Sequence, residues 1–125
     1  MALTANISNT FQIYITSNTT ETKTISNPGI TENLAKYMYF RIIGVRAINT
    51  TGTGNLQITN GAADIVAAQA TVNNAWKDML ITQANANVTS SQNLTIITSA
   101  AGWGNNSRII LDCVATDGGS ALTVS

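Results

Sequence analysis

The feature that most constrains this chain is an alternation of apolar and polar residues, in short stretches separated by clusters of Asn, Gly, Thr and Ser. Every second residue is apolar over 11–15, and the same period recurs over 94–98 and 108–115. Side chains of a strand point alternately to its two faces, so this period indicates strands with one buried face. No stretch forms a convincing helical pattern. We therefore predict an all-β fold, a single-domain β-sandwich that is jelly-roll-like and has about eight strands.

The longest predicted strand, 37–48, changes phase in its middle. Its core-facing residues are predicted to be Met38, Phe40, Ile42, Val45 and Ala47. Even-numbered residues face the core before Gly44 and odd-numbered residues face it afterwards. A glycine at such a point is typical of a β-bulge or bend that curves a sheet.

The middle of the chain has one strong turn signal and one ambiguous stretch. Asn60-Gly61 is the strongest hairpin-turn dipeptide in the sequence. The alanines of 64–72 permit a short helix, but the β-branched residues there favour a strand, which we predict. Trp76 is predicted to open the next strand with its side chain in the core. The polar segment 82–93 is predicted to connect this strand to the one at 94–98.

The whole chain, 1–125, is predicted to form one domain, since its length is near the common domain size. An extended N-terminal segment over 1–10 and a flexible C-terminal tail over 116–125, with a last short strand at 121–124, are expected to flank it. The first residues lack the basic and apolar regions of a secretory signal peptide. No apolar run reaches the roughly 18 residues that suggest a membrane-spanning helix.

The balance of charge argues against two classes of partner. Six basic and six acidic residues cancel to a net charge of zero, and the basic residues do not cluster. Nucleic acids and anionic membranes are bound largely through such clusters. We therefore expect neither nucleic acid nor membrane among the partners.

The residue types that most often carry catalysis are scarce. The chain has no histidine, which removes the commonest general base and metal ligand. Its one cysteine, Cys113, lies in an apolar stretch and is predicted to be an inert buried strand residue. A pair of carboxylates, Asp78 and Asp112, is the remaining catalytic device, and no Asp-x-Asp spacing suggests a calcium site. We predict that the protein is not an enzyme and has no catalytic residues, cofactor or metal.

Five residues are candidates for binding a partner. Trp103 stands between two glycines, beside Asn105, and an aromatic ring in such a loop can stack on a sugar or anchor a protein. The alternative is a tryptophan folded back as a lid over one end of the sandwich. Tyr37, Tyr39 and Arg41 form an outward row of types that are common at interfaces. The alternative for this row is a cross-strand aromatic pair on an exposed face.

Three stretches give the chain a resemblance to the decoration (cement) proteins of tailed-bacteriophage capsids: 39–49, the strand that Trp76 opens, and Gly102-Trp103-Gly104 leading into 108–115. The likeness is one of overall texture, with a sandwich pattern, few charges and abundant Thr and Asn. It implies a homotrimer on the outside of a capsid that clamps neighbouring subunits of the major capsid protein. It also implies a virion protein made in the host cytoplasm without a signal peptide.

Two other functions are consistent with the residues. A carbohydrate-binding module or receptor-binding fibre tip would use Trp103 in its Gly/Asn loop. A small β-sandwich enzyme would use Asp78 and Asp112. The leading hypothesis is a structural interaction protein of the capsid-decoration kind.

Overall fold

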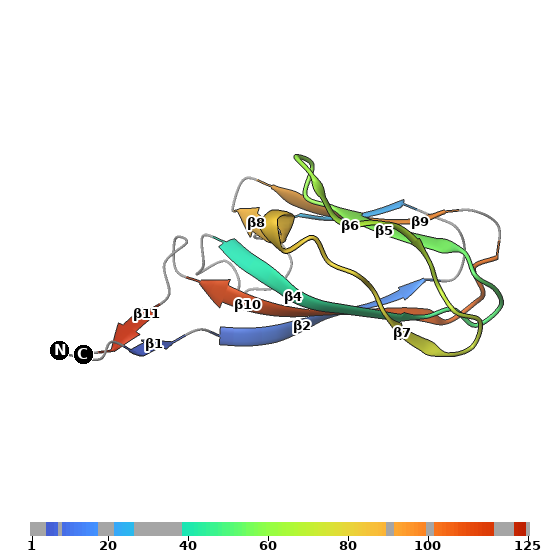
Figure 1. Ribbon diagram of the computed structural model, residues 1–125, viewed down its shortest axis with the longest axis horizontal. Coiled ribbons are helices and arrows are strands. Elements are labelled where there is room, and N and C mark those ends of the chain that lie inside the picture. Colours follow the sequence, from blue (N-terminus) through green and yellow to red (C-terminus); the bar gives the residue numbers. More distant parts are fainter. Residues whose placement is uncertain are drawn as a thin grey trace.

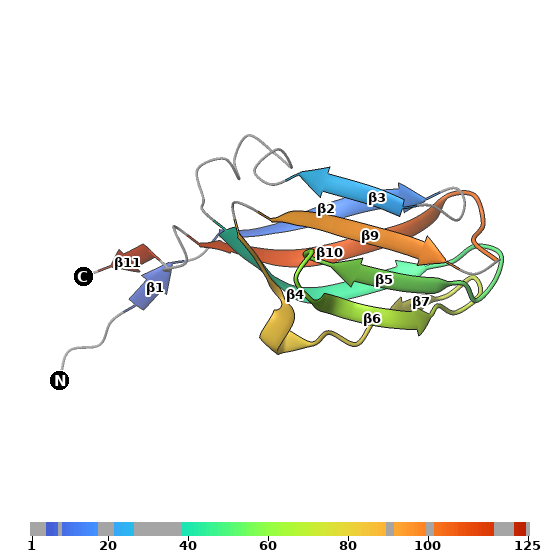
Figure 2. The ribbon, with the colours of Figure 1, turned by 90° about the horizontal axis from the view of Figure 1, so that it is seen from above.

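The computed structural model describes residues 5–7, 9–17, 22–26, 39–89, 92–99, 102–116 and 122–124. In this part of the chain two antiparallel sheets pack face to face, one with five strands and one with four (Figures 1 and 2). The predicted all-β sandwich is therefore confirmed. The described residues contain one short 3₁₀ turn, η2 (Gln83–Asn85), and no helix among them is long and apolar enough to cross a membrane.

The larger sheet has the order β2-β10-β4-β7, and β8 also pairs with β4. Its strands are β2 (Asn9–Ser17), β10 (Ser107–Thr116), β4 (Tyr39–Ile48), β7 (Trp76–Asp78) and β8 (Asn87–Thr89). The smaller sheet has the order β3-β9-β5-β6. Its strands are β3 (Thr22–Ser26), β9 (Asn93–Ser99), β5 (Asn55–Thr59) and β6 (Asp64–Ala70). All of these pairs are antiparallel.

The strand order is that of a jelly roll. β7 pairs with the C-terminal end of β4 and β8 with its N-terminal end, so both occupy one edge position. Eight strand positions result when the two segments are counted together. We number these eight positions along the chain, so that β2 is position 1 and β10 is position 8. The larger sheet then has the order 1-8-3-6 and the smaller sheet the order 2-7-4-5. Two nested Greek keys produce this pattern, which confirms the jelly-roll prediction.

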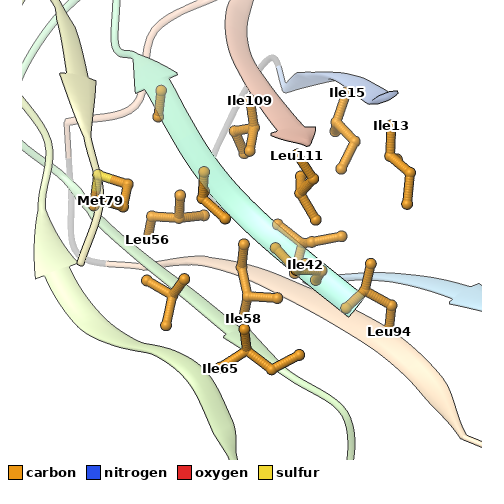
Figure 3. Packing of buried hydrophobic residues seen from close by; sticks show 14 of the residues in the cluster. Ile13, Ile15, Ile42, Leu56, Ile58, Ile65, Met79, Leu94, Ile109 and Leu111 are labelled. Atoms are coloured by element: carbon orange, nitrogen blue, oxygen red, sulfur yellow. The ribbon is translucent and has the colours of Figure 1, made fainter. Parts of the chain in front are cut away.

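The core fills the space between the two inner faces (Figure 3). The larger sheet contributes alternate residues such as Ile13, Ile15, Ile109 and Leu111, and the smaller sheet contributes Leu56, Ile58, Leu94 and Ile96. Burying each such side chain stabilises the fold by about 1.5–3 kcal/mol relative to leaving it exposed. The alternation seen in the sequence therefore corresponds to one inward face on each sheet.

The phase change in β4 is a β-bulge, as predicted. Ile42 pairs with Cys113 and Gly44 with Asp112, so Ile43 is the extra residue on β4. Phe40, Ile42, Val45 and Ala47 are all buried on the core side, while Met38 lies outside the described residues. The bulge lets both halves of this ten-residue strand face the same core.

The hairpin and the ambiguous stretch also follow the prediction. Asn60 and Gly61 lie in the turn between β5 and β6, and Gly61 has a φ of 90°. The stretch 64–72 forms strand β6 over Asp64–Ala70 rather than a helix. The expected last strand is β11 (Leu122–Val124), which pairs with β1 (Ala5–Ile7) in a separate two-stranded ribbon beyond one end of the sandwich (Figure 1).

Two predictions about the chain between β6 and β9 are wrong. Trp76 opens β7, as expected, but its side chain is 47% exposed instead of lying in the core. The reason is that Met79 fills the inward position in this segment, which leaves Trp76 and Asp78 on the outside. The polar stretch 82–93 is not only a connection, because it contains η2 and β8.

Candidate functional site

The outward row of the longest strand is only partly described. Tyr37 lies outside the described residues, and Tyr39 pairs through its backbone with Thr89 on one side and Thr116 on the other. The guanidinium of Arg41 is engaged within the chain. It donates to Asn87 Oδ1 at 3.1 Å, to the Gln83 carbonyl at 2.7 Å and to Gln83 Oε1 at 3.1 Å. Arg41 therefore links β4 to η2 and β8.

Trp103 is folded back over one end of the sandwich. Its side chain is 7% exposed, and Nε1 donates to the Asn55 carbonyl at 3.1 Å. Gly54 lies directly against the ring, because a Cβ atom at position 54 would overlap Trp103 Cδ1. Asn105 is exposed, and its carbonyl accepts a hydrogen bond from Thr50. The ring thus has no open face on which a sugar could stack. Trp103 is placed as the alternative interpretation expected, as a lid over one end of the sandwich.

A buried asparagine that the sequence did not single out joins the loops around this tryptophan. Asn49 is fully buried. Its Oδ1 accepts from the backbone N–H groups of Thr51, Gly52 and Gly104, and its Nδ2 donates to Thr71 Oγ1 and the Gly102 carbonyl. One side chain therefore connects the β4–β5 loop to two loops that are distant in sequence.

Exposed apolar side chains gather on the opposite side of the larger sheet from the core. Among the described residues, the large hydrophobic side chains most open to solvent are Tyr14, Ile43, Val72, Trp76 and Leu80, with Leu80 78% exposed. Tyr14, Ile43 and Trp76 lie on strands of the larger sheet, and Leu80 follows β7. Figure 1 shows none of the described elements covering the outside of β2, β10 and β4. We call the following set the outer face: Tyr14, Ile43, Arg46, Trp76, Asp78, Leu80, Arg108, Ile110 and Asp112.

The pairing register arranges these residues in rows across the sheet. One row reads Tyr14, Ile110, Arg46 and Asp78 from β2 to β7. The next reads Thr16, Arg108, Ile48 and Trp76. The Arg46 guanidinium lies 6.0 Å from the centroid of the Trp76 ring, at the limit of a cation–π contact. Apolar, aromatic and charged side chains therefore alternate over the outer face.

The β-bulge hollows the outer face. Two adjoining depressions, of about 500 Å³ and about 390 Å³, share Ile43, Gly44 and Asp112 as lining residues. Gly44 contributes no side chain, and a Cβ there would lie 3.2 Å from Asp112 Oδ2. The Gln12 amide donates to Asp112 Oδ1 at 2.8 Å and fixes that carboxylate beside the hollow.

Leu80 borders the smaller hollow, and hydrogen bonds hold its backbone in place. Its N–H donates to Gln69 Oε1 and its carbonyl accepts from Gln69 Nε2, both at 2.9 Å. On either side, Met79 N–H donates to the Val45 carbonyl and Thr82 N–H to the Ile65 carbonyl, both at 2.8 Å. A large apolar side chain is thus presented to solvent by a backbone that is already ordered.

The two aspartates considered as a catalytic pair lie apart on this open surface. Asp78 pairs with Arg46 and Asp112 with Gly44, so two strand spacings and two residues separate them. Strand geometry then gives roughly 12 Å between their Cα atoms. In the described ranges, no three His, Cys, Asp or Glu side chains gather as a metal site requires. The two carboxylates therefore do not converge on one point of the surface.

Cys113 lies on the core side of the same sheet, and its thiol is unreactive. It is 1% exposed, on the core side of β10. Burial, and secondarily the charge of Asp112, raises the pKa of its thiol to about 12. The thiolate is the reactive form of cysteine, and with this pKa the thiol of Cys113 stays protonated at neutral pH. Cys113 therefore acts as a small apolar residue of the core.

Comparison with protein families, with curated proteins and with solved structures found no match to this chain. The class of the protein is therefore defined by its own fold and surface. It is a jelly-roll β-sandwich whose larger sheet presents a bare outer face of aromatic, aliphatic and charged side chains.

Proposed function

We propose that this protein is a structural interaction protein that docks on other proteins through its outer face, as a decoration subunit of a viral capsid. Its partners are then the major capsid protein and further copies of the same chain. Its place is the outer surface of the virion, where it clamps neighbouring capsid subunits.

The composition of the outer face is the observation that supports a docking role. Trp, Tyr and Arg are the types most enriched among residues that dominate binding energy, and the outer face contains all three. Burial of Leu80, which is 78% exposed, against a partner would contribute up to about 1.5–3 kcal/mol, and burial of the half-exposed Trp76 would contribute part of that range. The fixed backbone at Leu80 lowers the entropy cost of ordering that site on binding.

The capsid setting is supported by the jelly-roll topology together with the resemblance of the sequence to decoration proteins. A net charge of zero favours close packing in an assembly, because copies of the chain do not repel one another. On a symmetric shell, many modest contacts add up to strong binding. The carbohydrate-binding alternative has no such support, since the ring of Trp103 is buried.

Co-sedimentation with capsids from the native source of the protein tests this function. The wild-type chain is expected to pellet with the capsids, and Leu80→Asp is expected to weaken binding at least about tenfold, because it places a charge where a partner buries an apolar side chain. Ala68→Asp is the matched control, since it adds the same charge at an exposed position of β6 in the other sheet. A wild-type chain that never pellets would refute the capsid role. Equal binding by the two variants would refute the use of the outer face.

A further inference from the structure

We propose that the free edge of β2 pairs with the β2 edge of a second copy of this chain, antiparallel across a two-fold axis that passes between the two Ile13 residues. The larger sheets of the two copies then form one continuous sheet. This inference rests on the proposed function in one respect, since it leaves the outer face to the capsid subunits. It predicts a dimer where the sequence resemblance implies a trimer.

β2 is the one long sheet edge that no described residue covers. Figure 2 shows β2 and β3 along one side of the sandwich, with no described strand beyond them. On the opposite side, the edge of the smaller sheet is covered, because Thr82 N–H donates to the Ile65 carbonyl of β6 at 2.8 Å. The edge of the larger sheet there is divided between β7 and β8, with three residues each. β3 has five residues, whereas β2 has nine.

β2 also lacks the features that keep free edges from pairing. Natural sheets protect an edge with charged residues, above all Lys, with proline or with a bulge. β3 contains Lys23 and β7 contains Lys77. β2 has neither a charged residue nor a proline, and its register with β10 is unbroken. An edge of this kind is a template for a further strand.

The hydrogen bonds of β4 show which backbone groups of β2 face the open edge. The Val45 carbonyl accepts and the Ile42 N–H donates on the side of β4 away from β10. Backbone groups of successive residues point to opposite edges of a strand, so the outward-facing residues of β4 bond to β10. Followed across β10, the same alternation makes the core-facing residues of β2 bond to β10. The outward-facing residues of β2 therefore direct their N–H and C=O groups to the open edge: Thr10, Gln12, Tyr14 and Thr16.

A two-fold axis at Ile13 pairs all of these groups. Ile13 is the middle of the nine residues, so the whole strand overlaps with its copy. Thr10 then lies opposite Thr16 of the second copy, and Gln12 lies opposite Tyr14, with each pairing made twice. Two bonds in each of the four pairs give eight backbone hydrogen bonds.

The side chains along this seam are compatible with their copies. On the core side, Phe11 lies opposite Ile15 and Ile13 lies opposite Ile13, and cross-strand pairs of aromatic and β-branched residues are favourable. On the outer side, threonine meets threonine and glutamine meets tyrosine. The nearest charged residues of the sheet, Arg108 and Asp112, lie on β10, one strand further from the seam, and do not face their own copies.

A second copy at this edge is consistent with the docking role of the outer face. A two-fold axis perpendicular to the sheet keeps both outer faces on the same side, so the pair presents eight strand positions to one surface. Two such faces can bind neighbouring subunits of one shell together, and linked contacts bind more strongly than single ones. The seam is about 31 Å long and one strand deep. Because this contact is smaller than a standard interface, we expect the free dimer to dissociate on dilution.

Charge pairs placed on the seam, followed by light scattering on a sizing column, test the pairing. Thr10 and Thr16 are exposed, so charges there leave the core intact. T10E/T16E places Glu opposite Glu twice. T10K/T16E differs from it only at position 10 and places Lys opposite Glu twice. We expect T10E/T16E to dimerise at least about tenfold more weakly than T10K/T16E, with circular dichroism confirming both folds.

Amide hydrogen exchange of the wild type identifies the surface that pairs. The N–H groups of Gln12 and Tyr14 face the open edge, so we expect their exchange to slow at least about fivefold between dilute monomer and concentrated dimer. The Leu80 N–H, which bonds to Gln69 within one copy, is the control and should exchange equally at both concentrations. A dimer in which Gln12 and Tyr14 exchange as fast as in the monomer would refute this edge, even if a charge variant does not fold.

The outcomes separate this inference from the proposed function. A wild-type chain with the mass of a monomer at every concentration up to about 1 mM would refute the pairing, and so would the mass of a trimer. Equal dimerisation by the two charge variants would refute the register. A monomer that still pellets with capsids refutes only this inference, whereas a dimer that does not pellet refutes only the capsid role.

Discussion

Replacing Asn49 by alanine removes the side chain that joins the loops at the Trp103 end of the sandwich. The change deletes five hydrogen bonds, three accepted by Oδ1 and two donated by Nδ2. A typical intramolecular hydrogen bond contributes about 1 kcal/mol net, and a buried group left without a partner costs about 1–3 kcal/mol. Thr71 keeps its bond to the Gly54 carbonyl, and water can reach the backbone of the exposed Thr51 but not that of the buried Gly104, so part of the loss is recovered. We expect Asn49→Ala to lower the free energy of unfolding by about 3–5 kcal/mol.

Urea denaturation followed by tryptophan fluorescence measures this loss, because Trp103 packs against the same loops. Asn105→Ala is the control: its side chain is exposed, and the hydrogen bond from Thr50 uses only its backbone carbonyl. We expect the control to change stability by less than about 0.5 kcal/mol. A loss below about 1 kcal/mol for Asn49→Ala would show that the network contributes little, and the reasoning from buried hydrogen bonds would be wrong.

Three further predictions concern other parts of the fold. Gly54→Ala should push Trp103 out of its site, shift its emission to the red and cost about 1–3 kcal/mol of stability; unchanged emission would contradict the packing of Gly54 on the ring. The pKa of Cys113 is 9.0 in the unfolded chain and about 12 in the folded chain. The protonated thiol therefore contributes its full share to the free energy of unfolding below pH 9, and this contribution is lost between pH 9 and 12. From pH 8 to 10.5 the wild type should therefore lose about 2 kcal/mol more than Cys113→Ala, and parallel curves would argue against a retained thiol proton. Gln69→Ala should speed hydrogen exchange at the Leu80 amide at least about tenfold, and unchanged exchange would show that the backbone there is ordered by other contacts.

Much of the fold could be predicted because local patterns and tertiary packing agree. The apolar period placed the core residues of β2, β9 and β10, and the phase change at Gly44 located the bulge. Such patterns reflect which face of a strand is buried, and a sandwich buries one face of every strand. The topology follows less directly, since the pairing partners of a strand lie far away in sequence.

The candidate site was harder to predict, for physical reasons that particular residues show. Trp76 looked like a core residue because apolar residues follow it, yet β7 is a three-residue edge segment whose facing is set by Met79. Leu80 carries no signal of exposure in the sequence, because Gln69 holds its backbone from another strand. Asn49 bonds to residues up to 55 positions away, which no local pattern reveals.

The most direct test of a docking role for the outer face is hydroxyl-radical footprinting of the chain, free and within the particle from its native source. The account predicts that Tyr14, Trp76 and Leu80 become protected in the particle, while Ile97 on the outside of the other sheet keeps the reactivity it has in the free chain. Unchanged reactivity of the first three residues, with protection elsewhere, would contradict the outer face as the surface that binds.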